Sequence, residues 1–291
     1  MAELTERQIE RFWTDGFLVV EDAVTAGELE GLRRQYAEWL AEASRRGKSW
    51  GETADKKARF DLDPVHTAEA PAIWRVNNPV EVSDTYHAVM MGSRIPDMVA
   101  ELIGPDIKFH HSKINTKPPH SDADVQFHQD FTGTPHSNAD IVTALLHLDE
   151  VSDENGCLRM VPGSHRGPIH TTWEGEVFTG MAGPEIRAAC ERDAVSISGP
   201  AGSVCLMHTR TLHGSRPNGS ARPRCVFISV YTAADAAPLC QSIVKSRLEG
   251  TIVRGHATHL ARCEPCEVEL PEIYGASSFR DIHERAITAE T

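Results

Sequence analysis

The chain has 291 residues, of which 40% are hydrophobic and 24% are charged, as in ordinary globular proteins with a sizeable core. Its 42 acidic and 29 basic residues give a net charge of −13, which argues against nucleic acid or an anionic membrane as the main partner, because phosphate binding needs concentrated Lys and Arg. The charged start "MAELTERQIERF" has no apolar signal segment, no apolar run is long enough for a membrane span, and most of the seven cysteines are scattered singly. We therefore expect a reduced, cytoplasmic protein.

Two helices and a short strand are expected near the N-terminus, over about residues 5–46. Thr5 and Gln8 have the spacing of a capping box at a helix start, and Thr25 and Glu28 repeat it. Apolar residues follow along one face of each helix, and "FLVV" between them is strand-like.

The chain then changes character. Residues 47–78 are polar and interrupted by prolines, which predicts a long loop that acts as a lid. Residues 105–232 consist of short β-type runs separated by Gly, Pro, Asn and Asp, and such a pattern predicts a β-sandwich or barrel. Residues 233–291 form a C-terminal extension. Because no repeat or linker divides the sequence, we treat it as one domain, 1–291.

A histidine and an aspartate, His128 and Asp130, lie one residue apart in the strand-like run "DVQFHQDFTG". Side chains alternate between the faces of a strand, so we expect these two to point the same way. His213 offers a third ligand, and two histidines with one carboxylate form the facial triad typical of non-haem iron oxygenases. Ser215 and Arg224, the latter eleven residues after His213, could hold the far carboxylate of an organic cosubstrate.

These motifs carry a family resemblance. "HQD" and "HGSRPNGSARPR", with "NGCLRMVPGSHRG" between them, resemble the phytanoyl-CoA dioxygenase family (PhyH-like) of iron(II)- and 2-oxoglutarate-dependent oxygenases. The resemblance covers roughly residues 8–232 and implies a mainly β fold with flanking helices, the double-stranded β-helix (jelly roll, cupin-like).

The resemblance also implies the chemistry and its residues. His128, Asp130 and His213 would bind Fe²⁺, and the distal carboxylate of 2-oxoglutarate would bind Arg224 and Ser215. With O₂, such an enzyme hydroxylates or otherwise oxidises a C–H bond of a small organic metabolite and releases succinate and CO₂. Related halogenases replace the carboxylate with a small residue, so the presence of Asp130 favours hydroxylation over halogenation.

Further candidates come from neighbouring segments. Polar residues that could support the metal-bound end of the cosubstrate are Lys113, Asn115, Gln126 and Arg75. His111 shares the face of Lys113 and Asn115 in "HHSKINTK". Aromatic residues that could line a substrate pocket, and that are equally plausible as core, are Phe131, Trp74 and Trp173. The segments expected to shape this pocket are 47–78, 131–139 and 166–190.

Two assignments have competitors. His208, at the end of "GSVCLMH", competes with His213 as third ligand, although the Gly-Ser after His213 and the arginine at its +11 position favour His213. Near the C-terminus, a tetrahedral zinc site is conceivable, but its ligands span too little chain to close easily around one ion, so ordinary reduced cysteines are favoured. Its ligands would be His256, His259, Cys263 and Cys266.

Other functions remain as alternatives at this point. A cupin-like isomerase or lyase would use the same three ligands without 2-oxoglutarate, and a metabolite-binding protein would catalyse nothing. Neither would need Ser215 and Arg224. The substrate could be an acyl-CoA, an amino acid, an osmolyte or a secondary metabolite, the outcome could be desaturation instead of hydroxylation, and the oligomeric state is open.

Overall fold

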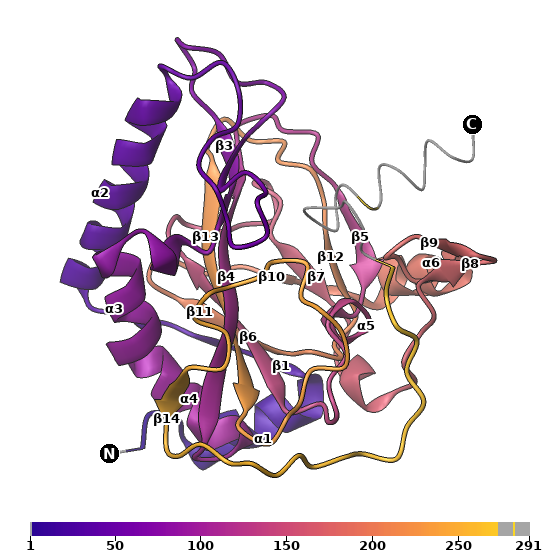
Figure 1. The fold of residues 1–291 in the computed structure, drawn as a ribbon. Helices are drawn as coiled ribbons and strands as arrows, with labels where there is room; N and C mark the ends of the chain where they lie inside the picture. The colour runs from indigo at the N-terminus through magenta and orange to yellow at the C-terminus, as the bar shows by residue number, and fades with distance from the viewer. Residues whose placement is uncertain (1, 273–281, 283–291) are drawn as a thin grey trace.

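The computed structural model describes residues 2–272 and 282 (Figure 1). The helices and 3₁₀ turns are α1 (Glu6–Asp15), α2 (Ala26–Ala43), η1 (Pro79–Glu81), α3 (Asp84–Gly92), α4 (Arg94–Ile103), α5 (Asp130–Gly133), η2 (Ser164–Arg166) and α6 (Pro184–Asp193). The strands are β1 (Phe17–Val20), β2 (Phe60–Leu62), β3 (Ile73–Asn77), β4 (Ile107–Lys117), β5 (Val125–His128), β6 (Ile141–His147), β7 (Leu158–Met160), β8 (Trp173–Glu174), β9 (Val177–Phe178), β10 (Val195–Ile197), β11 (Val204–His208), β12 (His213–Ser215), β13 (Arg224–Ala233) and β14 (Ile252–Arg254). Within this described part, no helix combines the length and the apolar character of a bilayer span.

An eight-stranded sheet forms the centre of the molecule, in the order β1-β11-β6-β13-β4-β3-β2, with β14 also paired to β4. Every residue of β13 is buried because both faces of the sheet are covered. Phe227 and Tyr231 pack with residues of α3 and α4 on one face, and Val226 and Ile228 belong to a second core on the other. Figure 1 shows α2, α3 and α4 stacked along one side of this sheet.

A smaller sheet, in the order β10-β7-β12-β5, covers the opposite face. Met160 and Ile197 from this sheet pack with Leu145 and Ile228 from the large sheet. The predicted jelly-roll architecture, with helices outside one sheet, is therefore confirmed. The interior between the two sheets is the place where strands from both halves of the chain face one another.

The N-terminal helices α1 and α2 are confirmed, and both capping boxes are formed. Helices α3 and α4 were not predicted, although Ser83 and Ser93 cap their first turns and are the sequence signal for them. The predicted lid is wrong over its last part, because β3 is hydrogen-bonded to β4 inside the large sheet. The five-residue run "IWRVN" is too short for its pattern to separate a strand from a loop.

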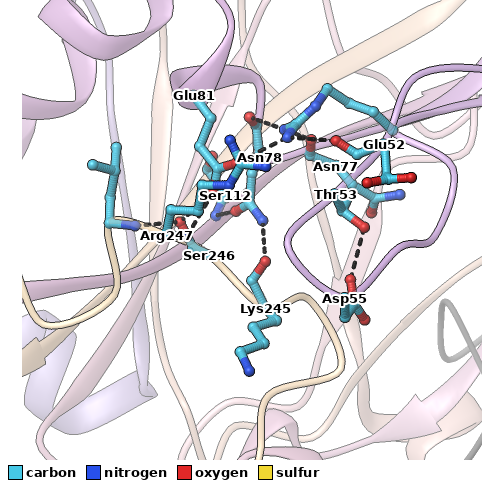
Figure 2. A network of polar contacts seen from close by, with 12 residues as sticks. Glu52, Thr53, Asp55, Asn77, Asn78, Glu81, Ser112, Lys245, Ser246 and Arg247 are labelled. Atoms are coloured by element: carbon cyan, nitrogen blue, oxygen red, sulfur yellow. Dashed lines mark hydrogen bonds and ion pairs between the residues drawn. The ribbon is translucent and has the colours of Figure 1, made fainter.

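A segment of the C-terminal extension, residues 242–247, passes beside the end of β3 and the middle of β4, and we call it the strap. Asn78 donates a hydrogen bond to the carbonyl oxygen of Lys245 at 2.9 Å, and Glu81 Oε1 accepts hydrogen bonds from Ser246 Oγ at 2.9 Å and from the backbone of Arg247 at 2.8 Å. Figure 2 shows these strap residues facing Asn78 and Glu81.

A buried arginine completes this network. Arg59 forms an ion pair with Glu81 at 2.9 Å, and both side chains are about 5% exposed or less. The same guanidinium donates to the carbonyl oxygens of Asn77 and Asn78, each at 2.9 Å. The strap is thus attached to the main body through buried charged groups.

Candidate metal centre

Two histidines from neighbouring strands of the small sheet face each other. His128 is the last residue of β5, His213 is the first of β12, and the two are register partners. Their ring centroids are 4.3 Å apart. We expected Asp130 on the same strand as His128, and this is wrong. Strand β5 ends at His128, and Asp130 begins the short helix α5. The turn of the chain nevertheless brings its carboxylate back to the two imidazoles.

The hydrogen bonds of the imidazoles fix which nitrogen is available. His128 Nδ1 lies 2.8 Å from the carbonyl oxygen of Gln126, and His213 Nδ1 lies 3.0 Å from that of Thr211. Because a carbonyl oxygen only accepts hydrogen bonds, both Nδ1 atoms carry the proton and both Nε2 atoms present a lone pair. The Nε2 atoms lie 3.6 Å and 3.7 Å from Asp130 Oδ1, too far for a hydrogen bond and suited to a shared ion.

The protonation states suit a cation. Burial, and then the neighbouring His128, lower the pKa of His213 to about 4, so its imidazole is neutral at pH 7. Burial alone would raise the pKa of Asp130, but His213, His128 and Lys113 outweigh it and hold that pKa well below the ordinary value. The Asp130 side chain keeps 22% of its surface exposed, which leaves one side of the cluster open.

These three residues are the only group of at least three His, Cys, Asp or Glu side chains in residues 2–272 and 282 whose ligand atoms come close enough to share an ion. His208 does not take part: its Nδ1 accepts a hydrogen bond from the Arg210 backbone at 3.1 Å, and its ring packs against Trp13. The C-terminal residues considered for zinc are exposed and form no such group in the described chain; they are His256, His259, Cys263 and Cys266.

A cavity of about 100 Å³, which we call the inner cavity, opens from this cluster between the two sheets. Its polar far end holds Lys117, Ser215 and Arg224, and the Lys117 Nζ donates a hydrogen bond to Ser215 Oγ at 2.7 Å. Arg224 is buried, its Nε has no hydrogen-bond partner, and in the described chain no carboxylate pairs with it. Burial lowers the pKa of Arg224 to about 10, which is still well above 7, so the guanidinium is protonated at pH 7.

Sequence reasoning missed Lys117. It lies on β4 two residues beyond Asn115 and four beyond Lys113, so strand alternation places all three on the inner face, and the inner cavity touches all three. Lys117 is also the register partner of Arg224. The alternation in "KINTK" was the signal that could have found it.

A second, smaller cavity, which we call the side cavity, has a volume of about 30 Å³. It is bordered by Arg75, His111 and Lys113 on one side and by Ser242, Ile243 and Val244 of the strap on the other. Residues common to both cavities are Arg75, Lys113, Asp130 and Thr143. The metal cluster therefore lies between the two cavities, with Asp130 reaching both.

Arg75 and Asn115, predicted near the cosubstrate, are register partners, and Arg75 Nε donates to Asn115 Oδ1 at 3.3 Å. The prediction for Gln126 is wrong, because its amide bonds to Asp124 and it lines neither cavity. The reason is an irregularity in the pairing of β5 with β12: Ser215 is opposite Val125 instead of Gln126, so the alternation shifts by one residue.

The three aromatic candidates have different positions. Trp74 lines the inner cavity, with the Arg75 guanidinium 4.4 Å from its ring centroid. Phe131 lines neither cavity and is 1% exposed in the core between the sheets. Trp173 packs on Phe178 behind the strap, with ring centroids 5.4 Å apart. Of the three, Trp74 alone lines the inner cavity.

The residues present fit iron and 2-oxoglutarate. Two imidazoles and one carboxylate with an open side match the facial triad of non-haem iron sites. A buried guanidinium with an unsatisfied Nε fits a carboxylate at the other end of the inner cavity, because buried charge requires a partner.

Comparisons with known proteins agree with this reading. The family model "Phytanoyl-CoA dioxygenase (PhyH)" matches residues 12–226. The chain is 36% identical over 244 residues to a probable alpha-ketoglutarate-dependent hypophosphite dioxygenase from Stutzerimonas stutzeri, covering 81% of this chain and 84% of that protein. It is 27% identical to an ectoine dioxygenase from Sphingopyxis alaskensis, covering 80% and 77%.

Solved structures show the same fold. The crystal structure of EctD from S. alaskensis with bound Fe superposes with a TM-score of 0.70 at 22% identity, covering 88% of this chain and 89% of that one. EctD with 2-oxoglutarate and 5-hydroxyectoine gives 0.64 at 25% identity, covering 90% and 88%. The chain belongs to the phytanoyl-CoA dioxygenase family and is an iron- and 2-oxoglutarate-dependent dioxygenase.

Proposed function

We propose that His128, Asp130 and His213 hold the ferrous ion and that Arg224 and Ser215 bind the distal carboxylate of 2-oxoglutarate in the inner cavity. The observation that carries this assignment is the Arg224 guanidinium, which is buried, has an unsatisfied Nε and faces the same cavity as the metal cluster. A diacid that reaches from the cluster to Arg224 satisfies both ends. The substrate is a small molecule that gains oxygen.

Each side chain of the metal cluster and the inner cavity has its own role. His128 and His213 present Nε2 lone pairs because their Nδ1 protons are held by carbonyl oxygens. Lys117 supports Ser215 and adds a second positive charge beside Arg224. Asn115 lines the inner cavity and not the side cavity, so we assign it to the cosubstrate. Iron with 2-oxoglutarate and O₂ supplies the oxidation, which yields succinate and CO₂.

Apolar side chains complete the inner cavity. Leu145, Met207 and Ile228 line it between the sheets. They exclude water from the reacting groups, which strengthens the ion pair between Arg224 and a bound carboxylate. Trp74 closes part of the same wall and is a candidate for substrate contact.

The test is succinate formation by Arg224→Ala with Fe²⁺, O₂ and 2-oxoglutarate and no added substrate. Loss of one partner of a buried charged pair costs about 2–5 kcal/mol, so we expect turnover at subsaturating 2-oxoglutarate to fall roughly 30-fold or more, with iron affinity retained. Arg222→Ala is the matched control, because Arg222 pairs with Glu150 at the surface, where its side chain is 58% exposed. Succinate formation by Arg224→Ala at the wild-type rate would refute the assignment.

A second candidate is oxidation of a reduced phosphorus oxyanion. The identity to the probable hypophosphite dioxygenase, 36%, exceeds the 27% identity to the S. alaskensis ectoine dioxygenase. In this reaction hypophosphite gains one oxygen atom from O₂ and becomes phosphite, while 2-oxoglutarate becomes succinate and CO₂. Phosphorus NMR of hypophosphite incubated with the loaded enzyme tests it, with ectoine as the comparison substrate. Succinate without any new phosphorus signal would exclude hypophosphite.

We also propose that the protein works in the cytoplasm, as a single domain, and not on nucleic acid or membranes. Support comes from the net charge of −13 and from the seven cysteines, all of them free. The contacts of the strap with Asn78 and Glu81 join the C-terminal extension to the rest of the chain. Fractionation of cells and an electrophoretic shift assay with DNA and RNA are direct checks.

A further inference from the structure

The two cavities carry more positive than negative charge. Four cationic side chains border them: Arg75, Lys113, Lys117 and Arg224. Of the cavity-lining residues in the described chain, Asp130 is the only carboxylate, so four positive and one negative side chain leave a net charge of plus three.

Iron and 2-oxoglutarate leave this excess in place. The ferrous ion adds two positive charges, and the two carboxylates of 2-oxoglutarate remove two. Arg224 and Lys117 lie together at the Ser215 end of the inner cavity, whereas Lys113 and Arg75 border both cavities beside Asp130. Because burying a charge without a counter-ion costs several kcal/mol, an additional anion beside Lys113 stabilises the loaded site, and Arg75 borders the same space.

Among the cationic side chains of the two cavities, Lys113 would be stabilised most by such an anion. No hydrogen bond or ion pair to its ammonium is formed by any residue of the described chain. It lies on β4 with His111 and Asn115 on the same face, and Asp130 is the only carboxylate among the described residues that line the side cavity with it. Its Nζ therefore has all three protons available to a ligand in the side cavity.

The strap makes this cavity small. Ser242, Ile243 and Val244 form its outer wall, and Ile243 and Val244 pack with Phe178 in a separate buried cluster. Lys57 Nζ donates to the Ile243 carbonyl oxygen at 3.4 Å, which fixes the wall from the other side. A cavity of about 30 Å³ holds a molecule of only a few non-hydrogen atoms.

We infer that the side cavity is the substrate site and that it takes a small anion, held by Lys113 and Arg75 and enclosed by Ser242, Ile243 and Val244. The inference rests on the proposed function, because it places the substrate beside the metal cluster. The wall lies outside residues 12–226, the part of the chain that the family model matches.

The test is calorimetric titration of the enzyme loaded with Fe²⁺ and saturating 2-oxoglutarate under nitrogen, so that the Arg224 end is filled. The probes are acetate and acetamide, which have the same shape and differ in charge. We expect acetate to bind at least about tenfold more tightly than acetamide. Lys113→Met should weaken acetate binding at least about tenfold, and Lys113→Arg should restore it to within about threefold.

Lys108→Met is the matched control on the same strand, because the Lys108 ammonium bonds to the Ala234 carbonyl oxygen and lines neither cavity. It should leave acetate binding unchanged. Ile243→Ala shortens a side chain of the wall and so enlarges the side cavity. The affinity for butyrate relative to acetate should therefore rise at least about fivefold.

Three results would overturn the inference. Equal binding of acetate and acetamide would show that the ligand's charge does not matter. An Ile243→Ala variant with the wild-type size preference would show that Ile243 does not limit the size of the ligand. A loss of 2-oxoglutarate affinity in Lys113→Met as large as its loss of acetate affinity assigns Lys113 to the cosubstrate, while the proposed function stands. A wild-type enzyme that neither binds 2-oxoglutarate nor forms succinate overturns the proposed function itself.

Discussion

Thr143 Oγ1 donates a hydrogen bond to Asp130 Oδ2 at 3.1 Å, on the side of the carboxylate that faces away from the two imidazoles. The other oxygen, Oδ1, is the atom that lies 3.6 Å from His128 Nε2 and 3.7 Å from His213 Nε2. One oxygen of Asp130 is thus held by β6 and the other is left for the metal. Thr143 fixes the rotation of the ligand without touching the ion.

Thr143→Val keeps the shape of the side chain and removes this hydrogen bond. Since groups that orient a metal ligand are typically worth 10–100-fold in affinity, we expect the Kd for Fe²⁺ to rise roughly tenfold or more. Anaerobic titration of the apoprotein with Fe²⁺ measures it. Thr232→Val is the matched control, because the buried Thr232 hydroxyl has no hydrogen-bond partner among the described residues and lies outside both cavities. Equal Fe²⁺ affinity in the two variants would contradict the role of Thr143.

Lys117→Met removes the positive charge beside Ser215 and Arg224. The hydrogen bond of 2.7 Å from Lys117 to Ser215 and the position of Lys117 in the inner cavity place this charge at the distal carboxylate. We expect KM for 2-oxoglutarate to rise roughly tenfold or more, since a charged hydrogen bond contributes about 1.5–3 kcal/mol, with unchanged affinity for Fe²⁺. Lys48→Met, at an exposed position, is the control. A normal KM in Lys117→Met would remove this lysine from the site.

Arg59→Met should destabilise the protein strongly. It leaves Glu81 buried without its ion-pair partner, and breaking a buried pair in this way costs about 3–5 kcal/mol. Glu150→Gln is the comparison, since its ion pair with Arg222 is exposed and worth at most about 1 kcal/mol. Urea unfolding of both variants measures the difference. A loss below about 1 kcal/mol in Arg59→Met would show that the network of Figure 2 adds little to stability.

Buried histidines make the protein sensitive to acid. Burial, with smaller effects of His165 and Arg210, lowers the pKa of His208 to about 3, whereas in the unfolded chain it is near 6.5. Between these two pH values the unfolded chain binds one more proton at this position, so the free energy of unfolding falls as the pH falls, by about 1.4 kcal/mol per pH unit. Above pH 6.5 the group is neutral in both states and has no effect.

His208→Gln removes this proton uptake, so the dependence of the unfolding free energy on pH between 6 and 5 should become shallower by about 1.4 kcal/mol per unit. Phe12→Leu is the control, because the Phe12 ring packs near His208 but does not titrate. It should lower stability and leave the slope unchanged. Urea titrations at several pH values measure both, and an unchanged slope in His208→Gln contradicts the prediction.

The parts of the site that depend on short motifs could be predicted from the sequence. His128, Asp130 and His213 were identified from two short motifs, and the structure brings them together although Asp130 lies beyond the end of its strand. The two capped N-terminal helices and a β-sandwich or barrel were likewise predictable, because capping and alternation are local patterns, whereas the jelly roll was implied by the family resemblance.

Other parts depend on pairing between distant segments. The irregular register of β5 and β12 exchanged Gln126 for Val125 at the cavity, and a pairing irregularity is invisible in either strand alone. The strap reaches Glu81 across a sequence separation of 165 residues, and no local pattern in the extension encodes that contact. Its three wall residues were therefore not among the candidates.

The partnership of His128 with His213 also has a consequence for folding. β5 and β12 are distant in the sequence, and pairing of distant strands is slow because the long loop between them must close first. His213 thus stays remote from His128 and Asp130 until the small sheet has assembled, and the unfolded chain does not hold the three ligands together. Ferrous ion therefore stabilises the assembled state by mass action, by about 2.7 kcal/mol at a hundred times its Kd.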